Sequence, residues 1–190
     1  MSDEVRIRAI TDADWDRIAE LERRTYLPLG LSEGQAALRS KAEVSPETCF
    51  VLTVDSRPGG YLVALPFPPF DYPDLYLGPT ATRQPVSGSR NLHLHDLVVA
   101  PRLRRRGLAQ RLLHHLTRTA LARGYEQISL VAVGRSQRFW AARGFTPQPA
   151  AGTPAGYGKN AVYMSRALPA AGQPTRRPAR HRAAGPCPTK

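Results

Sequence analysis

A strand, a basic turn and a helix follow one another in residues 91–123, and this succession limits the possible folds more than any other feature of the chain. Residues 91–99 (NLHLHDLVV) have the apolar pattern of a long strand. Leucines then recur on one face, which predicts a helix over 104–123 that ends at Gly124. A continuously apolar strand is expected at 127–133, as in a sheet covered on both faces. The sequence therefore predicts an α/β (α+β) domain.

The rest of the chain supplies the other elements of such a domain. Capping signals at Thr11 with Asp14, and at Ser32 with Gln35, predict the starts of two helices. The turn SRPGG at 56–60 predicts a hairpin. The remaining expected elements are a strand at 5–10, helices at 11–25 and 36–44, strands at 48–55 and 61–65, a loop at 66–90, a short helix at 136–142, and strands at 145–148 and 160–166.

The composition places no unusual demand on folding. The chain has 190 residues and is 42% hydrophobic, so a core can form without disulfides. The two cysteines, Cys49 and Cys187, suit a reducing compartment, and Cys49 is expected to be a small buried hydrophobe. No apolar stretch approaches the length of a membrane span, and the first residues do not resemble a secretory signal. We expect a cytoplasmic protein that does not enter a membrane.

Positive charge is concentrated in the second half of the chain. The net charge is +12, and Glu126 is the only acidic residue after Asp96. This asymmetry favours an anionic partner. A nucleic acid is possible, but a polyphosphate cofactor explains a local cluster more economically. Residues 167–190, rich in Pro, Ala and Arg, are expected to form a disordered tail.

The basic turn before the 104–123 helix has the chemistry of a phosphate site. Backbone N–H groups at a helix start lack intrahelical partners and lie at the positive end of the helix dipole. Gly107 would let the backbone approach a pyrophosphate, and Arg104, Arg105 and Arg106 would supply charge for the outer phosphates.

Two motifs make the chain resemble the GNAT superfamily of N-acetyltransferases. Arg104, Gly107 and Ala109 match the pattern R/Q-x-x-G-x-G/A, and FWAARGF at 139–145 is similar to the later F-Y-x-x-x-G-F. The resemblance implies acetyl-CoA as co-substrate and no metal. It implies that strand residues pair with the pantetheine arm, that the turn wraps the pyrophosphate, and that the later helix adds contacts. The expected cofactor-binding residues are Leu97, Val98, Val99, Arg104, Arg105, Arg106, Gly107, Leu108, Ala109, Gln110, Ser136, Phe139 and Trp140.

The resemblance also implies an architecture. It covers about residues 4–166 and implies a single domain with a central mixed sheet of about seven strands flanked by four helices. The fourth and fifth strands, 94–99 and 127–133, should splay apart to admit the thioester.

Two histidines precede the expected cofactor strand. Because strand residues i and i+2 face the same side, His93 and His95 are expected to share one face and Asp96 the other. A histidine can remove a proton from an ammonium substrate near neutral pH. The pattern is similar to the serotonin (arylalkylamine) N-acetyltransferase branch, in which two histidines have this role. Packed structural histidines remain an alternative, and Asp96 is either a competing base or a structural acceptor.

The proton donor is less well specified. Trp140 stands where the family has a tyrosine that acts as general acid, and an indole N–H is not a practical acid. Tyr163, Tyr157, a water molecule or unassisted departure of the thiolate could replace it, and Tyr163 is taken as the candidate catalytic residue.

The favoured function is acetyl transfer from acetyl-CoA to the primary amine of a small molecule by direct attack. Tyr26, Phe67 and Phe70 are the candidate substrate contacts, the last two in a loop that is either packed or a lid. The alternative is a protein or peptide N-acetyltransferase with an open groove. A nucleic-acid-binding protein that uses the basic tail is a third, less favoured reading. A monomer or a homodimer is expected.

Overall fold

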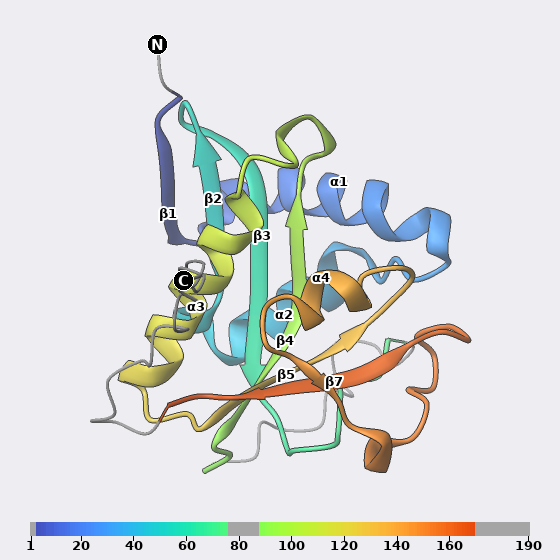
Figure 1. The fold of residues 1–190 in the computed structure, drawn as a ribbon. Helices are drawn as coiled ribbons and strands as arrows, with labels where there is room; N and C mark the ends of the chain where they lie inside the picture. Colours follow the sequence, from blue (N-terminus) through green and yellow to red (C-terminus); the bar gives the residue numbers. More distant parts are fainter. Residues whose placement is uncertain (1–2, 76–87, 170–190) are drawn as a thin grey trace, which may run out of the picture.

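A single seven-stranded sheet forms the centre of the molecule (Figure 1). The computed structural model describes residues 3–75 and 88–169. The strand order of the sheet is β1-β2-β3-β4-β5-β7-β6. Neighbouring strands are antiparallel except β4 and β5, which are parallel. The strands are β1 (Val5–Ala9), β2 (Phe50–Val54), β3 (Arg57–Pro66), β4 (Asn91–Val99), β5 (Gln127–Ala132), β6 (Thr146–Pro147) and β7 (Val162–Ala167).

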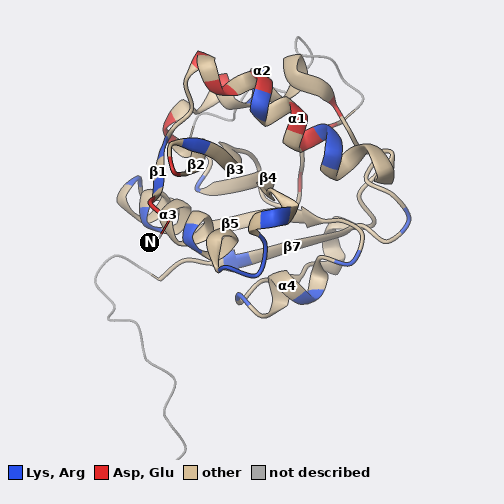
Figure 2. Ribbon diagram, turned by 90° about the horizontal axis from the view of Figure 1, so that it is seen from above, with Lys and Arg blue, Asp and Glu red and all other residues tan. Residues whose placement is uncertain are grey.

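Four helices cover the two faces of the sheet. Helices α1 and α2 pack together on one face, and α3 and α4 lie on the other (Figure 2). The helices are α1 (Trp15–Tyr26), α2 (Gly34–Val44), α3 (Leu108–Ala122) and α4 (Gln137–Ala141). Their inward side chains, such as Ile18, Leu38 and Leu112, are fully buried. The predicted mixed α/β domain with seven strands and four helices is confirmed.

The first predicted capping site is confirmed, and the second is wrong. The Asp14 carboxylate accepts hydrogen bonds from the Thr11 N–H (2.8 Å) and hydroxyl (2.7 Å). A 3₁₀ turn, Asp12–Asp14, then leads into α1. Ser32 instead donates its hydroxyl to Glu22, 2.8 Å away on α1, and α2 begins at Gly34. A hydroxyl with a buried carboxylate within reach bonds to it rather than to its own helix.

The hairpin between β2 and β3 is tighter than predicted. Asp55 and Ser56 both have left-handed backbone angles, φ 49° and 64°, the geometry of a two-residue turn. The predicted turn at 56–60 is therefore wrong, and Gly59 and Gly60 lie within β3. A Cβ on Gly60 would come 2.7 Å from the Val98 carbonyl oxygen, so glycine permits close pairing with β4.

The start of α3 also differs from the prediction. Residues Pro101–Leu103 form a 3₁₀ turn, Arg104 is extended, and the helix begins at Leu108 rather than at 104. Arg105 (φ 62°) and Gly107 (φ 73°) have left-handed backbone angles. A right-handed helix cannot continue through such residues, so it starts after them. The predicted glycine after the helix, Gly124, has φ 78°, as expected.

Two irregularities in β4 shape the functional region. The pairing with β3 shifts between Val63↔Asp96 and Ala64↔Leu94, which leaves His95 as an extra residue in a β-bulge. The pairing with β5 runs only from Asn91↔Gln127 to Leu94↔Leu130. Beyond Leu94 the two strands are no longer paired, which confirms the predicted splay.

Some predictions concern residues that lie outside the described part of the chain. Residues 76–87 of the long loop, including Tyr76, and residues 170–190 of the expected tail belong to this group. Within 3–75 and 88–169, no helix combines the length and hydrophobicity needed to cross a membrane.

Candidate active site

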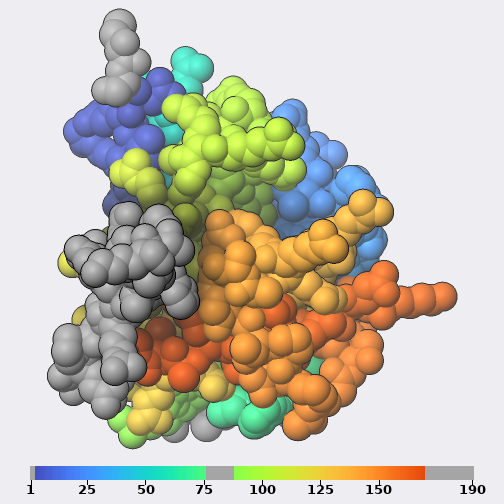
Figure 3. Space-filling view, in the orientation of Figure 1, coloured from blue at the N-terminus to red at the C-terminus, as the bar shows by residue number. Residues whose placement is uncertain are grey.

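A cleft of about 560 Å³ lies where β4, the turn before α3 and α4 meet. In the space-filling view, the yellow-green turn and the orange α4 region face each other across this part of the surface (Figure 3). Every residue of the expected cofactor set except Arg106 lines it. Those residues are Leu97, Val98, Val99, Arg104, Arg105, Gly107, Leu108, Ala109, Gln110, Ser136, Phe139 and Trp140.

The turn at the mouth of this cleft presents the start of α3. Arg104 is anchored by its Nε–H, which donates to the Val99 carbonyl at 3.2 Å. A Cβ on Gly107 would meet no atom within 4 Å, so its left-handed φ, not crowding, is what calls for glycine in this structure. The first N–H groups of a helix lack intrahelical acceptors, so this end of the cleft suits an anion.

Arg106 lies outside the cleft, contrary to the expectation. Its guanidinium is 2.6 Å from the Asp3 carboxylate, and it lines a shallow groove along the outer side of α3. The left-handed backbone of Arg105 changes the direction of the chain between Arg104 and Arg106. In this structure two of the three consecutive arginines line the cleft.

Helix α4 forms the apolar wall of the cleft. Trp140 is buried and packs edge-on against Phe139 and Phe145, with ring centroids 4.9 and 5.4 Å apart. Arg143, which was not predicted, also lines the cleft, and its guanidinium carbon lies 3.5 Å from the Phe139 ring centroid. Its Nε is buried without a hydrogen-bond partner among the described residues. Its place within FWAARGF was the signal in the sequence.

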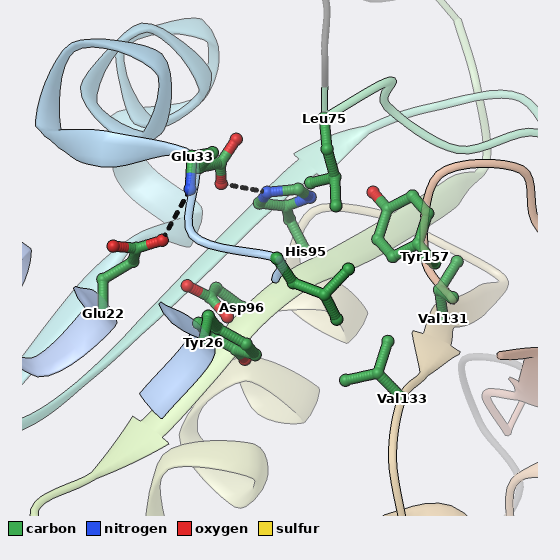
Figure 4. Close-up of a pocket in the computed structure, with 10 residues that line it drawn as sticks. Glu22, Tyr26, Glu33, Leu75, His95, Asp96, Val131, Val133 and Tyr157 are labelled. Atoms are coloured by element: carbon green, nitrogen blue, oxygen red, sulfur yellow. Dashed lines mark hydrogen bonds and ion pairs between the residues drawn. The ribbon is translucent and has the colours of Figure 1, made fainter. Parts of the chain in front are cut away.

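A second, small cavity of about 30 Å³ is drawn in Figure 4. The cleft is lined by Thr25 and Leu97 and the cavity by their chain neighbours Tyr26 and Asp96, so α1 and β4 contribute residues to both. The cavity combines acidic groups with apolar side chains from β5 and the loops. Its lining is Glu22, Tyr26, Leu31, Glu33, Leu75, His95, Asp96, Val131, Val133 and Tyr157.

A buried chain of polar groups ends in this cavity. The Nε2 atom of His95 lies 2.6 Å from a Glu33 oxygen, and the other Glu33 oxygen bonds to Lys41. Glu22 in turn accepts the backbone N–H of Glu33 at 2.8 Å. Burial alone would raise the pKa of Glu33, but His95 and Lys41 outweigh it and lower the pKa to about 2. Glu22, Glu33 and Lys41 were not found from the sequence, because they lie far from His95 along the chain.

Asp96 enters the same cavity from β4. It accepts a hydrogen bond from the Tyr61 hydroxyl and interacts with Tyr26. Burial raises its pKa to about 6, against the opposing effects of His95 and the two tyrosines. The expectation that Asp96 and His95 face opposite sides is wrong, because the β-bulge at His95 breaks the alternation.

His93 lies away from the cavity. Its ring is buried, its Nδ1 is 3.1 Å from the Ser129 hydroxyl, and it stacks on Tyr163 at 6.3 Å. Burial lowers its pKa to about 3. The ring centroids of His93 and His95 are 6.4 Å apart, but only His95 lines the cavity. His93 therefore has the surroundings of a neutral, packed histidine.

Of the candidate aromatic residues, some line the cavity and others do not. Tyr26 lines the cavity, but Tyr163 does not, and its hydroxyl accepts the Phe70 N–H at 3.0 Å. Phe67 is buried in the core and Phe70 is half exposed, and neither lines the cavity. Tyr157, the other tyrosine considered as an acid, does line it and donates its hydroxyl to the Pro73 carbonyl at 2.7 Å.

The acidic groups do not form a metal centre. Within the described ranges, no set of three or more His, Cys, Asp or Glu side chains has the arrangement needed to hold a metal ion. Glu33 and Asp96 are instead engaged by Lys41, His95, Tyr61 and Tyr26.

Solved structures of low sequence identity share this fold. The GNAT-like decarboxylase GphF in complex with isobutyryl-CoA is 21% identical with a TM-score of 0.70, over 86% of this chain and 100% of that one. The ribosomal-protein-S18-alanine N-acetyltransferase from Escherichia coli is 18% identical with a TM-score of 0.59, over 90% and 97%. N-acetylglutamate synthase from Neisseria gonorrhoeae, complexed with coenzyme A and N-acetyl-glutamate, is 19% identical with a TM-score of 0.64, over 88% of this chain and 36% of that protein.

Sequence comparison shows the family. Among curated proteins none is similar enough to give a significant match. The model of the acetyltransferase (GNAT) family, by contrast, matches residues 15–145, more than half of the chain and all of the segment that carries the cleft and its turn. This chain is thus a member of the acetyltransferase (GNAT) family, which indicates an acyltransferase enzyme.

Proposed function

We propose that this protein transfers an acetyl group from acetyl-CoA to the primary amine of a small molecule. The observation that carries the proposal is the small acidic cavity that shares α1 and β4 with the cleft, at the point where β4 and β5 separate. A basic cleft and an acidic cavity that share one strand suit an anionic donor and a cationic acceptor.

The residues of the cleft fit acetyl-CoA. The start of α3, with Arg104 and Arg105, suits the pyrophosphate, and the edge of β4 that has lost its β5 partner offers backbone groups to the pantetheine amides. Trp140 and Phe139 give the apolar wall for the arm. When bound there, acetyl-CoA supplies an activated acyl group for attack by an amine.

The cavity fits the head of an ammonium ion. Glu22, Glu33 and Asp96 give it carboxylates, and of these Glu33 is paired with Lys41. Its volume of about 30 Å³ is on the scale of a water molecule or an ammonium group. Opposite charge at short range in a buried site favours the cation strongly.

The rim of the cavity suits an apolar substituent on that amine. Leu75, Val131, Val133 and Tyr157 lie on the side away from the carboxylates (Figure 4). A substrate with its own carboxylate would meet Glu22, Glu33 and Asp96, with no lysine or arginine among the described residues of the lining. We therefore propose an alkyl- or arylalkylamine rather than an amino acid, in keeping with the arylalkylamine branch predicted from the histidine pattern.

Asp96 is the proposed base that removes the proton of the ammonium. An amine attacks only when it is neutral, and a group with a pKa near 6 is mostly ionised at neutral pH and still accepts protons. His95 is the second acceptor in the cavity. His93 is not proposed as a base, because it is buried away from the cavity and its pKa is about 3. Tyr163 is likewise not proposed as the acid.

An open peptide site is the alternative function. Leu27 and Leu29 are 58% and 50% exposed between α1 and α2, and Leu29 approaches Gly134, the neighbour of the cavity residue Val133. Two exposed leucines at the mouth of the site would suit the side chains of a peptide whose terminal amine enters the cavity.

The test is a thiol-release assay with acetyl-CoA and a panel of acceptors. The panel contains alkylamines, arylalkylamines, amino acids and short peptides with free amino termini. We expect turnover with the apolar amines and about 100-fold less with Asp96→Asn, the scale of a lost general base. Preference for peptides would support the alternative. Binding of coenzyme A without turnover of any amine would overturn the proposed function.

A further inference from the structure

The buried group Lys41–Glu33–His95 has an arrangement that the fold alone does not explain. A lysine, a carboxylate and an imidazole are joined in a row, and the side chains of all three are 3–4% exposed. Burying charged groups costs free energy that well-packed apolar side chains would not cost. Such a group next to a substrate cavity indicates a role in the site.

We propose that Glu33 is a positioning residue that holds His95 with its Nδ1 facing the amine as a proton acceptor, and that Lys41 fixes Glu33. This inference rests on the proposed amine acetyltransferase activity. It assigns roles to two residues of the α1–α2 region: Glu33 acts on the proton transfer through His95, and Lys41 acts through Glu33.

The position of Glu33 is fixed from three sides. One carboxylate oxygen pairs with Lys41 of α2 and the other with His95 of β4. The backbone N–H of Glu33 donates to the Glu22 carboxylate of α1 at 2.8 Å, and the hydroxyl of the preceding residue, Ser32, also donates to Glu22 at 2.8 Å. A carboxylate held in this way cannot turn away from His95 without breaking several buried bonds.

His95 has one nitrogen engaged and one free. Its Nε2 is 2.6 Å from Glu33, whereas its Nδ1 is buried and has no hydrogen-bond partner among the described residues. In Figure 4 the free nitrogen lies on the side of the ring that faces away from Glu33, toward Leu75 and Tyr157. A buried polar atom without a partner is rare, and in a cavity it indicates where a ligand atom binds.

Glu33 also determines which nitrogen carries the proton. An ionised carboxylate can only accept, so the Nε2 of His95 must carry the hydrogen that lies between them. In the neutral ring, Nδ1 then has a free lone pair directed at the cavity. A substrate N–H would complete the hydrogen bonding of His95.

Acetylation of a primary ammonium requires two proton acceptors, and the cavity has two, Asp96 and His95. A primary ammonium loses one proton before it attacks and a second as it becomes an amide. In this scheme Asp96 takes the first. The nitrogen lone pair then forms the C–N bond, the C–S bond breaks with its electrons left on sulfur, and the second N–H proton passes to Nδ1 of His95. The imidazolium stays paired with Glu33 until its proton leaves to solvent.

Three variants test the positioning role. The paired change Glu33→Gln with Lys41→Met removes both charges, so no unpaired charge is left buried, and the amide no longer fixes the proton on Nε2. His95→Gln keeps an amide N–H near the Nε2 position for Glu33 but has no atom in place of Nδ1. Glu20→Gln removes a carboxylate that pairs with Arg17 and Arg24 on α1 outside the cavity, and serves as the matched control.

Turnover with the best amine separates the proposal from a structural role. We expect kcat to fall by about 10–100-fold in Glu33→Gln/Lys41→Met, as when the partner of a functional histidine is lost, with KM for the amine changed much less. The kcat of His95→Gln should be reduced by at least as much, although Glu33 and Lys41 remain intact. The kcat of Glu20→Gln should match that of the wild type. A kcat of Glu33→Gln/Lys41→Met or of His95→Gln within about two-fold of the wild type would overturn the proposal.

A second readout does not depend on activity. The nitrogen NMR shifts of His95, assigned by their absence in His95→Gln, report which ring nitrogen is protonated. We expect the Nε2–H form in the wild type and a mixture of both forms in Glu33→Gln/Lys41→Met. Finding Nδ1–H as the neutral form of the wild type would overturn the positioning role even in an active enzyme. Lack of turnover with every amine would count against the proposed function, and these shifts would still decide whether Glu33 positions His95.

Discussion

Burial shifts the pKa values of two titratable residues of β4 in opposite directions. It lowers the pKa of His93 to about 3, so this imidazole is neutral at physiological pH. It raises the pKa of Asp96 to about 6, so this carboxyl group changes charge in the mildly acidic range. The same desolvation therefore produces a packed histidine and a carboxylate suited to proton transfer, three residues apart in one strand.

The pH dependence of stability should show the cost of ionising Asp96. Its pKa is raised on folding, so its favourable contribution is present below about pH 4 and is lost as the pH rises through about 6. Asn at this position does not ionise. The stability of Asp96→Asn relative to the wild type should therefore increase by about 2–3 kcal/mol between about pH 4 and pH 8. Urea unfolding of both proteins at the two pH values measures the change, and a difference that does not vary with pH would contradict it.

Arg143 should contribute to coenzyme A binding. It lines the cleft, and its buried Nε has no partner among the described residues. Arg143→Met keeps much of the apolar contact with Phe139 and removes the charge. We expect the Kd for coenzyme A, measured by calorimetry, to rise about 10-fold, the scale of one charge-assisted hydrogen bond. Arg138→Met, an exposed position on α4 outside the cleft lining, is the control and should leave the Kd unchanged.

At the scale of secondary-structure elements, the local sequence pattern predicted where strands and helices form. The apolar runs at 91–99 and 127–133 predicted β4 and β5, and the leucine spacing predicted α3. The β-bulge could not be predicted, because an extra residue in β4 is defined only by its register with β3. That bulge decides that His95 and Asp96 share a cavity, so the strict alternation assumed for the strand gave the wrong faces.

The structure brings the predicted cofactor residues together in one cleft where they are contiguous in the sequence, and it adds residues from distant parts of the chain that were not predicted. The turn and strand residues of the cleft follow one another in the chain, and they were found together with the motif. Glu33 meets His95 across 62 residues, in a loop between α1 and α2 that carries no periodic pattern. Only the packing of that loop on β4 gives Glu33 its partner, so one sequence could not reveal the pair.

The pairing of β3 with β4 should depend on Gly60 more than on Gly59. A Cβ on Gly60 would lie 2.7 Å from the backbone oxygen of Val98, whereas one on Gly59 would lie 2.4 Å from the end of the flexible Leu103 side chain. Backbone in a central strand cannot move as a side chain can. Gly60→Ala should lower the free energy of unfolding by about 1–3 kcal/mol and weaken coenzyme A binding through Val98, and Gly59→Ala should cost less. Equal losses in urea unfolding would contradict this account.

At the scale of the whole molecule, the two sides of the site differ in charge. Helices α1 and α2 carry residues of both signs, whereas the turn before α3 and the region around α4 carry arginines and no acidic residue (Figure 2). The chain has 27 basic and 15 acidic residues, so the acidic cavity is an exception within a basic protein. The field of the molecule therefore attracts an anion to the cleft, while the amine is selected by short-range contacts inside the cavity.

This difference in charge predicts that salt affects the two substrates unequally. Arg104 and Arg105 are exposed at the mouth of the cleft, where ions screen charge over about 10 Å at 0.1 M salt. The carboxylates of Glu33 and Asp96 are buried, and salt screens buried groups much less. Raising salt from about 0.05 to 0.5 M should increase the Kd for coenzyme A about 10-fold or more and change KM for a monoamine by less than about three-fold, at saturating acetyl-CoA. Arg104→Gln with Arg105→Gln should flatten the salt dependence of coenzyme A binding and leave that of the amine as it was. If the amine were the more salt-sensitive substrate, an open, solvent-screened acceptor site of the kind expected for peptides would explain the data better than the closed acidic cavity.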